Sequence, residues 1–361
     1  MNEARRAVVH FVVPDGIDDP QRVSGGNRYD QQVRDGLRGS GWDLRMILVP
    51  EIGTTVVASA LAELPDEALV LVDGLVAVRE PPALGVHANR LRIVVLAHMV
   101  ASATPQSSSA GMAMVATIDG ERQSLRAAKR IITTSEFTRA ELLAGGFAAP
   151  GTVVVARAGT QPAAATIASP SGGRLLCVGV VAPHKGQDLL IRALSHLTDV
   201  DGWRCTVVGS LDAAPAFVDD LAQSVRDGNL ATRVSFTGVL AGKRLDDAYS
   251  RADLLVLPSR SESFGMVVAE GVARGIPVVA ARVGGIPEAI PAGASGVFVP
   301  PEDPWAFEMV LRHWWGSPQW RRDLKDAAML ARATTRSWSD TIALIDSTLA
   351  EVAFSAAEVS A

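Results

Sequence analysis

Residues 258–288 read PSRSESFGMVVAEGVARGIPVVAARVGGIPE, and this stretch decides the fold. The apolar run that ends at Pro258 predicts a strand buried on both faces, and Gly265 allows the backbone to turn from a loop into a helix. A second apolar, β-branched run at residues 278–280 predicts the next strand. A strand, a helix and another strand in this order form the repeating unit of a parallel sheet covered by helices.

Strand and helix patterns alternate along the rest of the chain as well. Besides the strand before Pro258, at residues 254–257, and the strand at residues 278–280, the expected strands are residues 8–13, 44–49, 68–72, 93–96, 131–133, 153–155, 175–178, 205–208 and 234–236. Residues 161–173, rich in Pro, Ser, Gly and Ala, are expected to link two domains. We therefore predict an α/β protein with two parallel-sheet domains, residues 1–163 and 170–336, that face a cleft where ligands bind.

Composition excludes several classes of protein. A chain of 361 residues with 48% hydrophobic and 20% charged residues is globular and long enough for two domains. A net charge of -5 argues against a nucleic-acid partner, and two cysteines make no disulfide framework. No apolar run reaches the roughly 18 residues that a membrane span needs. A cytoplasmic protein is expected, and a peripheral membrane contact stays open.

Glu262 and Glu270 stand on either side of the expected turn into a helix. The N-terminus of a helix offers N–H groups and a positive dipole end, so phosphate binds there readily. A carboxylate nearby accepts two hydrogen bonds from a vicinal diol, which suits the ribose or hexose of a sugar nucleotide. Taken singly, each glutamate also fits a structural role, as a solvated loop residue or as a charge that favours the helix dipole.

The whole stretch closely resembles the donor-site signature of glycosyltransferase family 4, in which seven residues separate two glutamates and Ser-Phe-Gly follows the first. The resemblance implies that Glu262 contacts the donor sugar and that Glu270 binds the nucleotide ribose. The donor-binding segment is expected to continue through Ser263, Phe264, Gly265 and Met266, the last three through their backbone N–H groups.

A second segment, CVGVVAPHKG at residues 177–186, carries the same resemblance. The family pattern is Gly-Arg-Leu, three residues, then Lys-Gly, and its arginine and lysine neutralise the donor diphosphate. Gly179 and Lys185 align with this pattern, whereas Val180 replaces the arginine. Lys185 is therefore expected to supply most of the diphosphate stabilisation unless another arginine enters the site. The candidates are Arg260 and Arg28.

The amino half resembles the family more loosely. Gly25 and Gly26 follow the first strand, where the family has a glycine-rich loop whose backbone approaches the diphosphate or acceptor; a plain turn would explain them equally. His98 follows a strand, where the family often places a histidine beside the reacting sugar carbon, and a structural histidine is the alternative. Ser135 is expected to cap the next helix, with Glu136 at its start.

The resemblance implies a GT-B fold of two Rossmann-like domains, the first for the acceptor and the second for the donor. A C-terminal helix, about residues 337–361, is expected to cross back to the first domain. The implied reaction moves a hexosyl group from a GDP- or UDP-hexose, such as GDP-mannose, with retention of anomeric configuration. The expected catalytic residues are Glu262, Lys185 and His98. The acceptor is a hydroxyl of an unidentified glycan, glycolipid or small molecule, near a loop at residues 99–114.

No metal or other cofactor is expected. The only Asp-x-Asp sequence, at residues 199–201, lies in a helix-to-strand turn at the sheet edge opposite the expected site. A phosphorylase-like enzyme shares the broad fold, but no pyridoxal-phosphate lysine segment is evident. A non-catalytic sugar-nucleotide-binding protein stays open as the alternative, because Val180 replaces the arginine. The sequence does not specify the oligomeric state.

Overall fold

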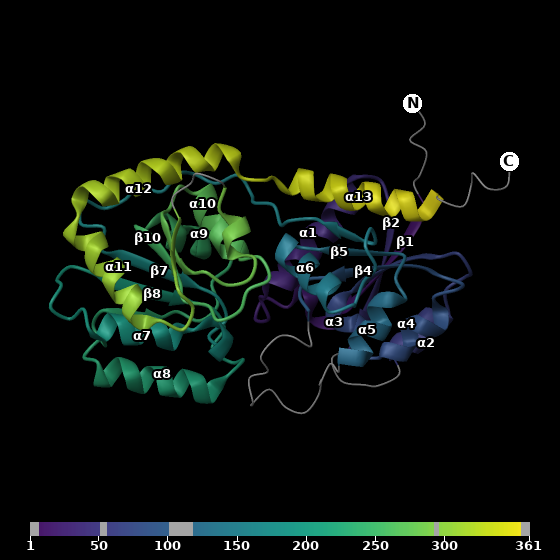
Figure 1. The fold of residues 1–361 in the computed structure, drawn as a ribbon, viewed down its shortest axis with the longest axis horizontal. Coiled ribbons are helices and arrows are strands. Elements are labelled where there is room, and N and C mark those ends of the chain that lie inside the picture. The colour runs from purple at the N-terminus through teal and green to yellow at the C-terminus, as the bar shows by residue number, and fades with distance from the viewer. Residues whose placement is uncertain (1–6, 51–55, 101–117, 292–295, 355–361) are drawn as a thin grey trace. The chain divides into compact units, whose positions relative to one another are not determined.

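The chain forms two compact units. The computed structural model describes residues 7–50, 56–100, 118–291 and 296–354. Within these ranges, one unit comprises residues up to 159 together with Trp338–Phe354, and the other comprises Thr160–Ser337. Each unit contains a six-stranded, fully parallel sheet covered by helices (Figure 1). The α/β class and the two Rossmann-like sheets predicted from the sequence are confirmed.

The first sheet has the strand order β2-β1-β3-β4-β5-β6. Its strands are β1 (Val8–Pro14), β2 (Asp43–Val49), β3 (Leu69–Asp73), β4 (Arg92–Ala97), β5 (Arg130–Thr133) and β6 (Val153–Val155). Its helices are α1 (Gly25–Gly39), α2 (Val56–Ala62), α3 (Gly74–Ala77), α4 (Pro81–His87), α5 (Ile118–Arg126), α6 (Glu136–Ala144) and α13 (Trp338–Phe354), with a 3-10 turn η1 (Asp15–Asp18). Apart from Asp73 at the end of β3 and Arg92 at the start of β4, these central strands are apolar, because helices cover both of their faces.

The C-terminal helix α13 packs on α1 and on strands β3 to β5 of the first unit. Gly36 of α1 makes this close packing feasible, because a Cβ atom there would lie 2.5 Å from Ile342 of α13. Helices α2, α4 and α5 lie on the other face of the sheet (Figure 1). The predicted return of the C-terminal helix to the first domain is confirmed as far as Phe354; residues 355–361 lie outside the described part.

The second sheet has the strand order β12-β11-β10-β7-β8-β9. Its strands are β7 (Arg174–Val178), β8 (Arg204–Val208), β9 (Val234–Phe236), β10 (Leu254–Leu257), β11 (Val278–Ala281) and β12 (Gly296–Val299). Its helices are α7 (Gln187–Ser195), α8 (Pro215–Asp227), α9 (Lys243–Ser250), α10 (Met266–Ala273), α11 (Pro304–Gly316) and α12 (Pro318–Ala331), with 3-10 turns η3 (Pro183–Lys185), η4 (Ile286–Ala289) and η5 (Arg332–Thr334).

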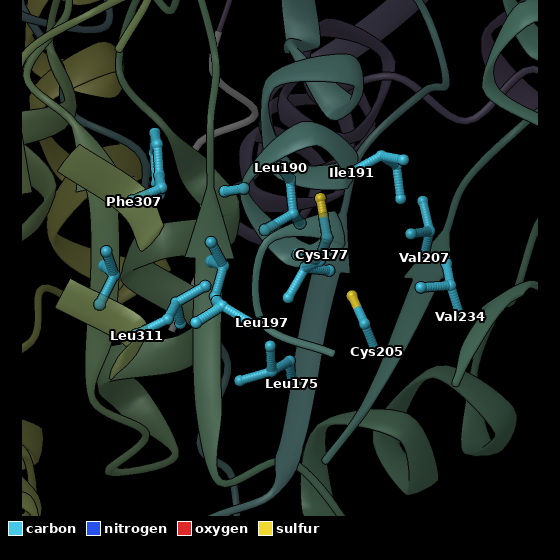
Figure 2. Close-up of a cluster of buried hydrophobic side chains, with 14 of the residues drawn as sticks. Leu175, Cys177, Leu190, Ile191, Leu197, Cys205, Val207, Val234, Phe307 and Leu311 are labelled. Atoms are coloured by element: carbon cyan, nitrogen blue, oxygen red, sulfur yellow. The ribbon is translucent and has the colours of Figure 1, made fainter. Parts of the chain in front are cut away.

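One face of the second sheet packs against α7, α8 and α11. Figure 2 shows Leu190 of α7 and Phe307 of α11 in this core, with Cys177 and Cys205 on the neighbouring strands β7 and β8. Both cysteines are free and buried. Burial raises the pKa of the Cys177 thiol to about 12, so it stays uncharged beneath the loop that follows β7.

In each sheet, one strand marks the point where the chain reverses its direction of winding. In the first sheet, β2 lies on one side of β1 and β3 on the other; in the second, β8 lies on one side of β7 and β10 on the other. Connections leave such a strand pair in opposite directions and open a crevice at the carboxyl ends, where open α/β sheets bind ligands. The pairs β1–β3 and β7–β10 are therefore where functional groups are expected.

The segment 161–173 differs from the expected interdomain linker, because it belongs entirely to the second unit. Lys325 donates to the carbonyl of Thr166 at 3.0 Å. The buried carboxylate of Asp253 accepts hydrogen bonds from the backbone and hydroxyl of Ser169. These contacts satisfy backbone groups of a segment that is itself neither strand nor helix. The chain instead passes between the units at residues 159–160 and 337–338.

Candidate functional site

The structure brings Lys185 and Glu262 together at the β7–β10 pair. Lys185 follows β7 and Glu262 follows β10, and the Lys185 Nζ atom lies 2.6 Å from Glu262 Oε1. The hydroxyl of Ser259 donates to the same carboxylate oxygen at 3.0 Å. The side chains of Lys185 and Glu262 are 23% and 12% exposed, so the pair is shielded but accessible to a ligand. Lys185 and Glu262 were both predicted as site residues. They are 77 positions apart in the sequence, and in the structure they form one charged pair.

Glycines let three loops meet at this pair. Gly186 has a left-handed φ of +67°, and a Cβ atom there would overlap with the carbonyl oxygen of Pro258. Gly284, in the loop after β11, has φ +52°, and a Cβ atom there would overlap with the carbonyl oxygen of Glu262. That same carbonyl accepts a hydrogen bond from the N–H of Gly285 at 3.0 Å. The position of Glu262 is therefore fixed from both sides by backbone that only glycine permits.

The segment after Glu262 enters α10 as the sequence predicted. Gly265 is the N-cap residue, with φ +87°, and Met266 is the first helical residue. Phe264 is 5% exposed and packs beneath the turn, while Ser263 precedes it in the loop. N–H groups in the first turn of a helix have no acceptor within the helix, so this turn suits a phosphate.

Glu270 lies about one turn into α10. Its Oε2 atom accepts a hydrogen bond from the hydroxyl of Tyr249 at 2.6 Å. Tyr249, at the end of α9, is fully buried. The sequence analysis did not single out this tyrosine, because α9 and α10 are separate elements whose contact depends on tertiary packing.

Arg260 does not replace the missing arginine in this structure. Its guanidinium makes two hydrogen bonds of 2.7 Å to the carboxylate of Asp188, and its Nε donates to Glu302 at 2.9 Å. These hydrogen bonds raise the pKa of Arg260 above its ordinary value. The charge of Arg260 therefore ties loops of the second unit together. Arg28, the other candidate, lies in α1 of the first unit.

Three described neighbours of Lys185, namely His184, Val180 and Gly179, add no positive charge beside it. Burial, followed by the charge of Lys185, lowers the pKa of His184 to about 4, so its imidazole is neutral at physiological pH. The carbonyl of Val180 accepts a hydrogen bond from the side chain of Gln187 at 2.9 Å. The N–H of Gly179 donates to the carbonyl of Val208 at 2.9 Å. Gly179 and Val180 thus lie in the expected loop, held by the edge of β8 and the start of α7.

In the first unit, His98 lies between two buried carboxylates at the β1–β3 pair. It follows β4 directly, and its Nε2 atom lies 2.9 Å from Asp30 of α1 and 3.3 Å from Asp73, the last residue of β3. The side chains of His98, Asp30 and Asp73 are 8%, 1% and 3% exposed. Neither aspartate was predicted as a site residue, although one ends an apolar strand and the other lies on the apolar side of an amphipathic helix.

The charge state of this cluster follows from its burial. Burial alone would lower the pKa of His98, but the attraction and hydrogen bonds of Asp30 and Asp73 outweigh it and raise the pKa to about 10. Burial raises the pKa of Asp30 to about 7, while His98 acts in the opposite direction. His98 is therefore an imidazolium at neutral pH. The ligand atoms of these three residues lie within 4.8 Å of one another, so they could also hold a metal ion.

Two further predictions from the amino half can be placed. Gly25 and Gly26 form the first turn of α1, capped by the side chain of Ser24, and not the loop before it that the sequence suggested. The Ser24 hydroxyl can cap the helix there, whereas the glycines leave its first turn accessible. A Cβ atom at Gly26 would lie 3.5 Å from the His98 ring, so this turn borders the histidine.

The structure also places the other predicted features. Ser135 caps α6, and Glu136 pairs with Arg139 on its surface. Asp199 and Asp201 precede β8, at the opposite end of the second sheet from Glu262, and pair with arginines of neighbouring elements. Of the loop at residues 99–114, only the first two residues lie within the described part. Among the described residues, no helix is long and apolar enough to cross a membrane.

The fold has the features of the GT-B class. It has two Rossmann-like units, each with polar groups at its chain reversal, and a C-terminal helix that packs on the first unit. Residues 172–315 match the family described as Glycosyl transferases group 1. The match lies within the second unit and includes Lys185, Glu262 and Glu270. Residues 172–315 are therefore similar to the group 1 glycosyltransferases, and the two units have the GT-B fold that the resemblance to family 4 implied.

Similar proteins agree with this match. D-inositol 3-phosphate glycosyltransferases of Streptosporangium roseum and Nocardiopsis dassonvillei are 34% and 35% identical over 248 and 247 residues, which is 63% of this chain in both cases. The chain spans only 56% and 57% of the length of these curated relatives. A sucrose-phosphate synthase from Thermosynechococcus elongatus shares the fold with a TM-score of 0.79 and 21% identity, covering 97% of this chain and all of that one. The structure of Anabaena HepE in complex with UDP and glucose shares the fold with a TM-score of 0.73 and 18% identity, covering 96% of this chain and all of that one.

Replacing Gly284 with alanine should displace Glu262 as well as strain the backbone. Gly238 provides a matched control, because it also has a left-handed φ (+69°) but no atom within 4 Å of where a Cβ would lie. Gly238→Ala should cost about 1–2 kcal/mol of unfolding free energy from backbone strain alone. Gly284→Ala should lower the melting temperature further and weaken nucleotide binding. Equal losses in the two variants, measured by thermal denaturation and calorimetry, would contradict this account.

The Asp30–His98 pair should make stability depend on pH. The folded-state pKa of His98 lies above its unfolded value of 6.5, so its contribution is complete below about pH 6.5 and is lost as the pH rises through about 10. The raised pKa of Asp30 likewise makes the folded state less stable as the pH rises from about 4 to 7. The difference in melting temperature between wild type and Asp30→Asn/His98→Gln should therefore narrow from pH 6.5 to 9.

The control for this pH series is His196→Gln. His196 also pairs with a carboxylate, that of Glu308, but its side chain is 60% exposed. The difference between wild type and this control should stay nearly constant over the same pH range. The melting temperatures of wild type and the Asp30–His98 double variant are compared in the same way. If their difference stays constant or widens as the pH rises, His98 is not held as an imidazolium.

Proposed function

We propose that this protein is a retaining glycosyltransferase that moves a hexosyl group from a nucleotide-diphosphate sugar to a hydroxyl acceptor. The observation that carries the proposal is the Lys185–Glu262 pair beside the N-terminus of α10. A cation and a helix N-terminus suit the diphosphate, and carboxylates suit the hydroxyls of the sugar and ribose. The family match within the second unit supports the same reading.

The pair also suggests how the site prepares for its donor. Glu262 holds the Lys185 ammonium at 2.6 Å and keeps it from turning into solvent. We propose that the diphosphate takes over the ammonium, and that the carboxylate then accepts hydrogen bonds from the sugar. Lys185 would stabilise the charge that develops on the leaving diphosphate, which is the usual source of rate in preorganised polar sites.

The proposed mechanism uses no enzymatic base and no metal. The leaving diphosphate accepts the proton of the attacking hydroxyl on the same face of the sugar, so the anomeric configuration is retained. Glu262 orients the donor sugar, and Glu270 the ribose. His98, held as an imidazolium by its two carboxylates, is proposed to act beside the reacting sugar. Asp30 and Asp73 keep it charged and oriented.

The relatives suggest the first substrates to test. The curated relatives are named D-inositol 3-phosphate glycosyltransferases, and HepE was seen with UDP and glucose. We propose a GDP- or UDP-hexose as donor, and D-inositol 3-phosphate as the first acceptor to try among small molecules, glycans and glycolipids. The activity is proposed to take place in the cytoplasm.

Thermal shift with UDP, GDP, ADP and their sugars tests the donor proposal. A ligand that binds only the folded state stabilises it by about 2.7 kcal/mol at 100 times its dissociation constant. One base should raise the melting temperature more than the others, and its sugar conjugate should be hydrolysed or transferred. Binding without hydrolysis or transfer would favour the non-catalytic alternative. Failure of every nucleotide to bind would contradict the proposed function.

Lys185→Ala should lower turnover at least tenfold, because Lys185 would supply most of the charge that faces the diphosphate. Lys243→Ala is the control: Lys243 also pairs with a carboxylate, that of Asp247, but is 85% exposed on α9. Steady-state rates should be measured with and without EDTA. Unchanged turnover in Lys185→Ala would remove this residue from the mechanism. Activity lost in EDTA and restored by magnesium would show that a metal neutralises the diphosphate.

A further inference from the structure

Glu270 is held by a buried network on its inner side. The hydroxyl of Tyr249 donates to Glu270 Oε2 at 2.6 Å, a length typical of a hydrogen bond to a charged oxygen. The Tyr249 side chain is completely buried, although Glu270 itself is partly exposed. The hydroxyl therefore contacts the carboxylate from within the protein.

Tyr249 is itself fixed in place by its neighbours. The guanidinium of Arg274 lies 4.4 Å from the centre of the Tyr249 ring, and it also donates to the backbone carbonyl of Glu270 at 3.1 Å. Asp246, one turn earlier on α9, accepts a hydrogen bond from Arg274 at 2.6 Å. Thr166 donates to the Tyr249 carbonyl at 3.4 Å. Ring, hydroxyl and carboxylate thus form one connected unit that joins α9 to α10.

This network restricts the orientation of the Glu270 carboxylate. A glutamate side chain near the surface samples several rotamers, and fixing it for each binding event costs conformational entropy. A carboxylate accepts about four hydrogen bonds, so the bond from Tyr249 leaves acceptor capacity for a diol. The carboxylate accepts hydrogen bonds from two hydroxyls on adjacent carbons at the same time only when its plane is already oriented.

We infer that Tyr249 is a positioning residue that orients Glu270 to accept hydrogen bonds from both ribose hydroxyls, so that the site selects ribonucleotides over 2′-deoxyribonucleotides. The inference rests on the proposed role of Glu270 in binding the donor ribose. A site built to hydrogen-bond a hydroxyl discriminates strongly against an analogue that lacks it, because its polar groups are left unpaired. An unoriented glutamate adapts to one hydroxyl almost as well as to two, and discriminates less.

The test compares Tyr249→Phe with wild type, using calorimetry with UDP and 2′-deoxy-UDP, or with the GDP pair if guanine is the preferred base. Wild type should bind the ribonucleotide at least about tenfold more tightly. Tyr249→Phe should weaken ribonucleotide binding by about 2- to 13-fold, the range for the net contribution of one typical hydrogen bond, and change 2′-deoxynucleotide binding little. The selectivity ratio should fall accordingly, with kcat at saturating donor within about twofold of wild type.

Ser250→Ala is the control, because Ser250 is the next residue on α9 and its hydroxyl donates to the carbonyl of Asp247 instead. It should keep the wild-type selectivity ratio. If Tyr249→Phe does not fold, as judged by circular dichroism, Arg274→Lys removes the group packed on the ring and should lower the ratio in the same direction.

The outcomes separate this inference from the proposed function. A wild type that binds no nucleotide contradicts the proposed function itself. In another outcome, the wild type binds ribonucleotides selectively while Tyr249→Phe keeps the same selectivity ratio between ribonucleotide and 2′-deoxynucleotide. That result would overturn the role of Tyr249 and leave the proposed function standing. Equal weakening of both nucleotides in Tyr249→Phe would indicate a purely structural tyrosine and would also overturn the inference.

Discussion

The close approach of backbone at the β7–β10 chain reversal is the constraint on which the second unit depends. The loop after β7 contacts the end of β10 through Gly186, and the loop after β11 contacts Glu262 through Gly284. A side chain at either glycine would force the loops apart. Because the loops meet, Lys185 and Glu262 pair across two different connections, and α10 begins at the correct place to orient Glu270. Local backbone freedom thus determines the long-range geometry.

The candidate sites of the two units differ in how their positive charge is placed. In the second unit, the side chain of Arg260 is engaged by Asp188 and Glu302, and burial keeps His184 neutral, so the positive charge beside Glu262 comes from Lys185. In the first unit, a positive histidine is enclosed by two carboxylates with almost no exposure. Burying such groups costs free energy unless each is paired and hydrogen-bonded. Strongly shifted pKa values in a buried cluster at a chain reversal are typical of functional sites.

Much of the fold could be predicted because its signals are local. Runs of β-branched residues, Gly265 before a helix and the fixed spacing of Glu262 and Glu270 are all read within one short segment. The partners of the key residues could not be predicted. Asp30 and Asp73 are separated from His98 by 68 and 25 positions, and their convergence depends on strand order. The segment 161–173 looked like a linker because composition reveals irregular backbone but not the distant side chains that bind it.

The C-terminal helix contributes to the first unit's histidine through one aromatic residue. Trp338, the first residue of α13, packs in a T-shaped arrangement on Tyr29 with the ring centroids 5.4 Å apart, and Tyr29 packs in the same manner on His98 with the centroids 5.3 Å apart. Tyr29 is next to Asp30 on α1, and its hydroxyl donates to the carbonyl of Ala156 at 2.7 Å. The same helix α1 therefore carries a carboxylate that charges His98, a ring that packs on it and the glycine on which α13 rests. A helix more than 200 residues away in sequence supports the histidine because it packs on the helix that orients it.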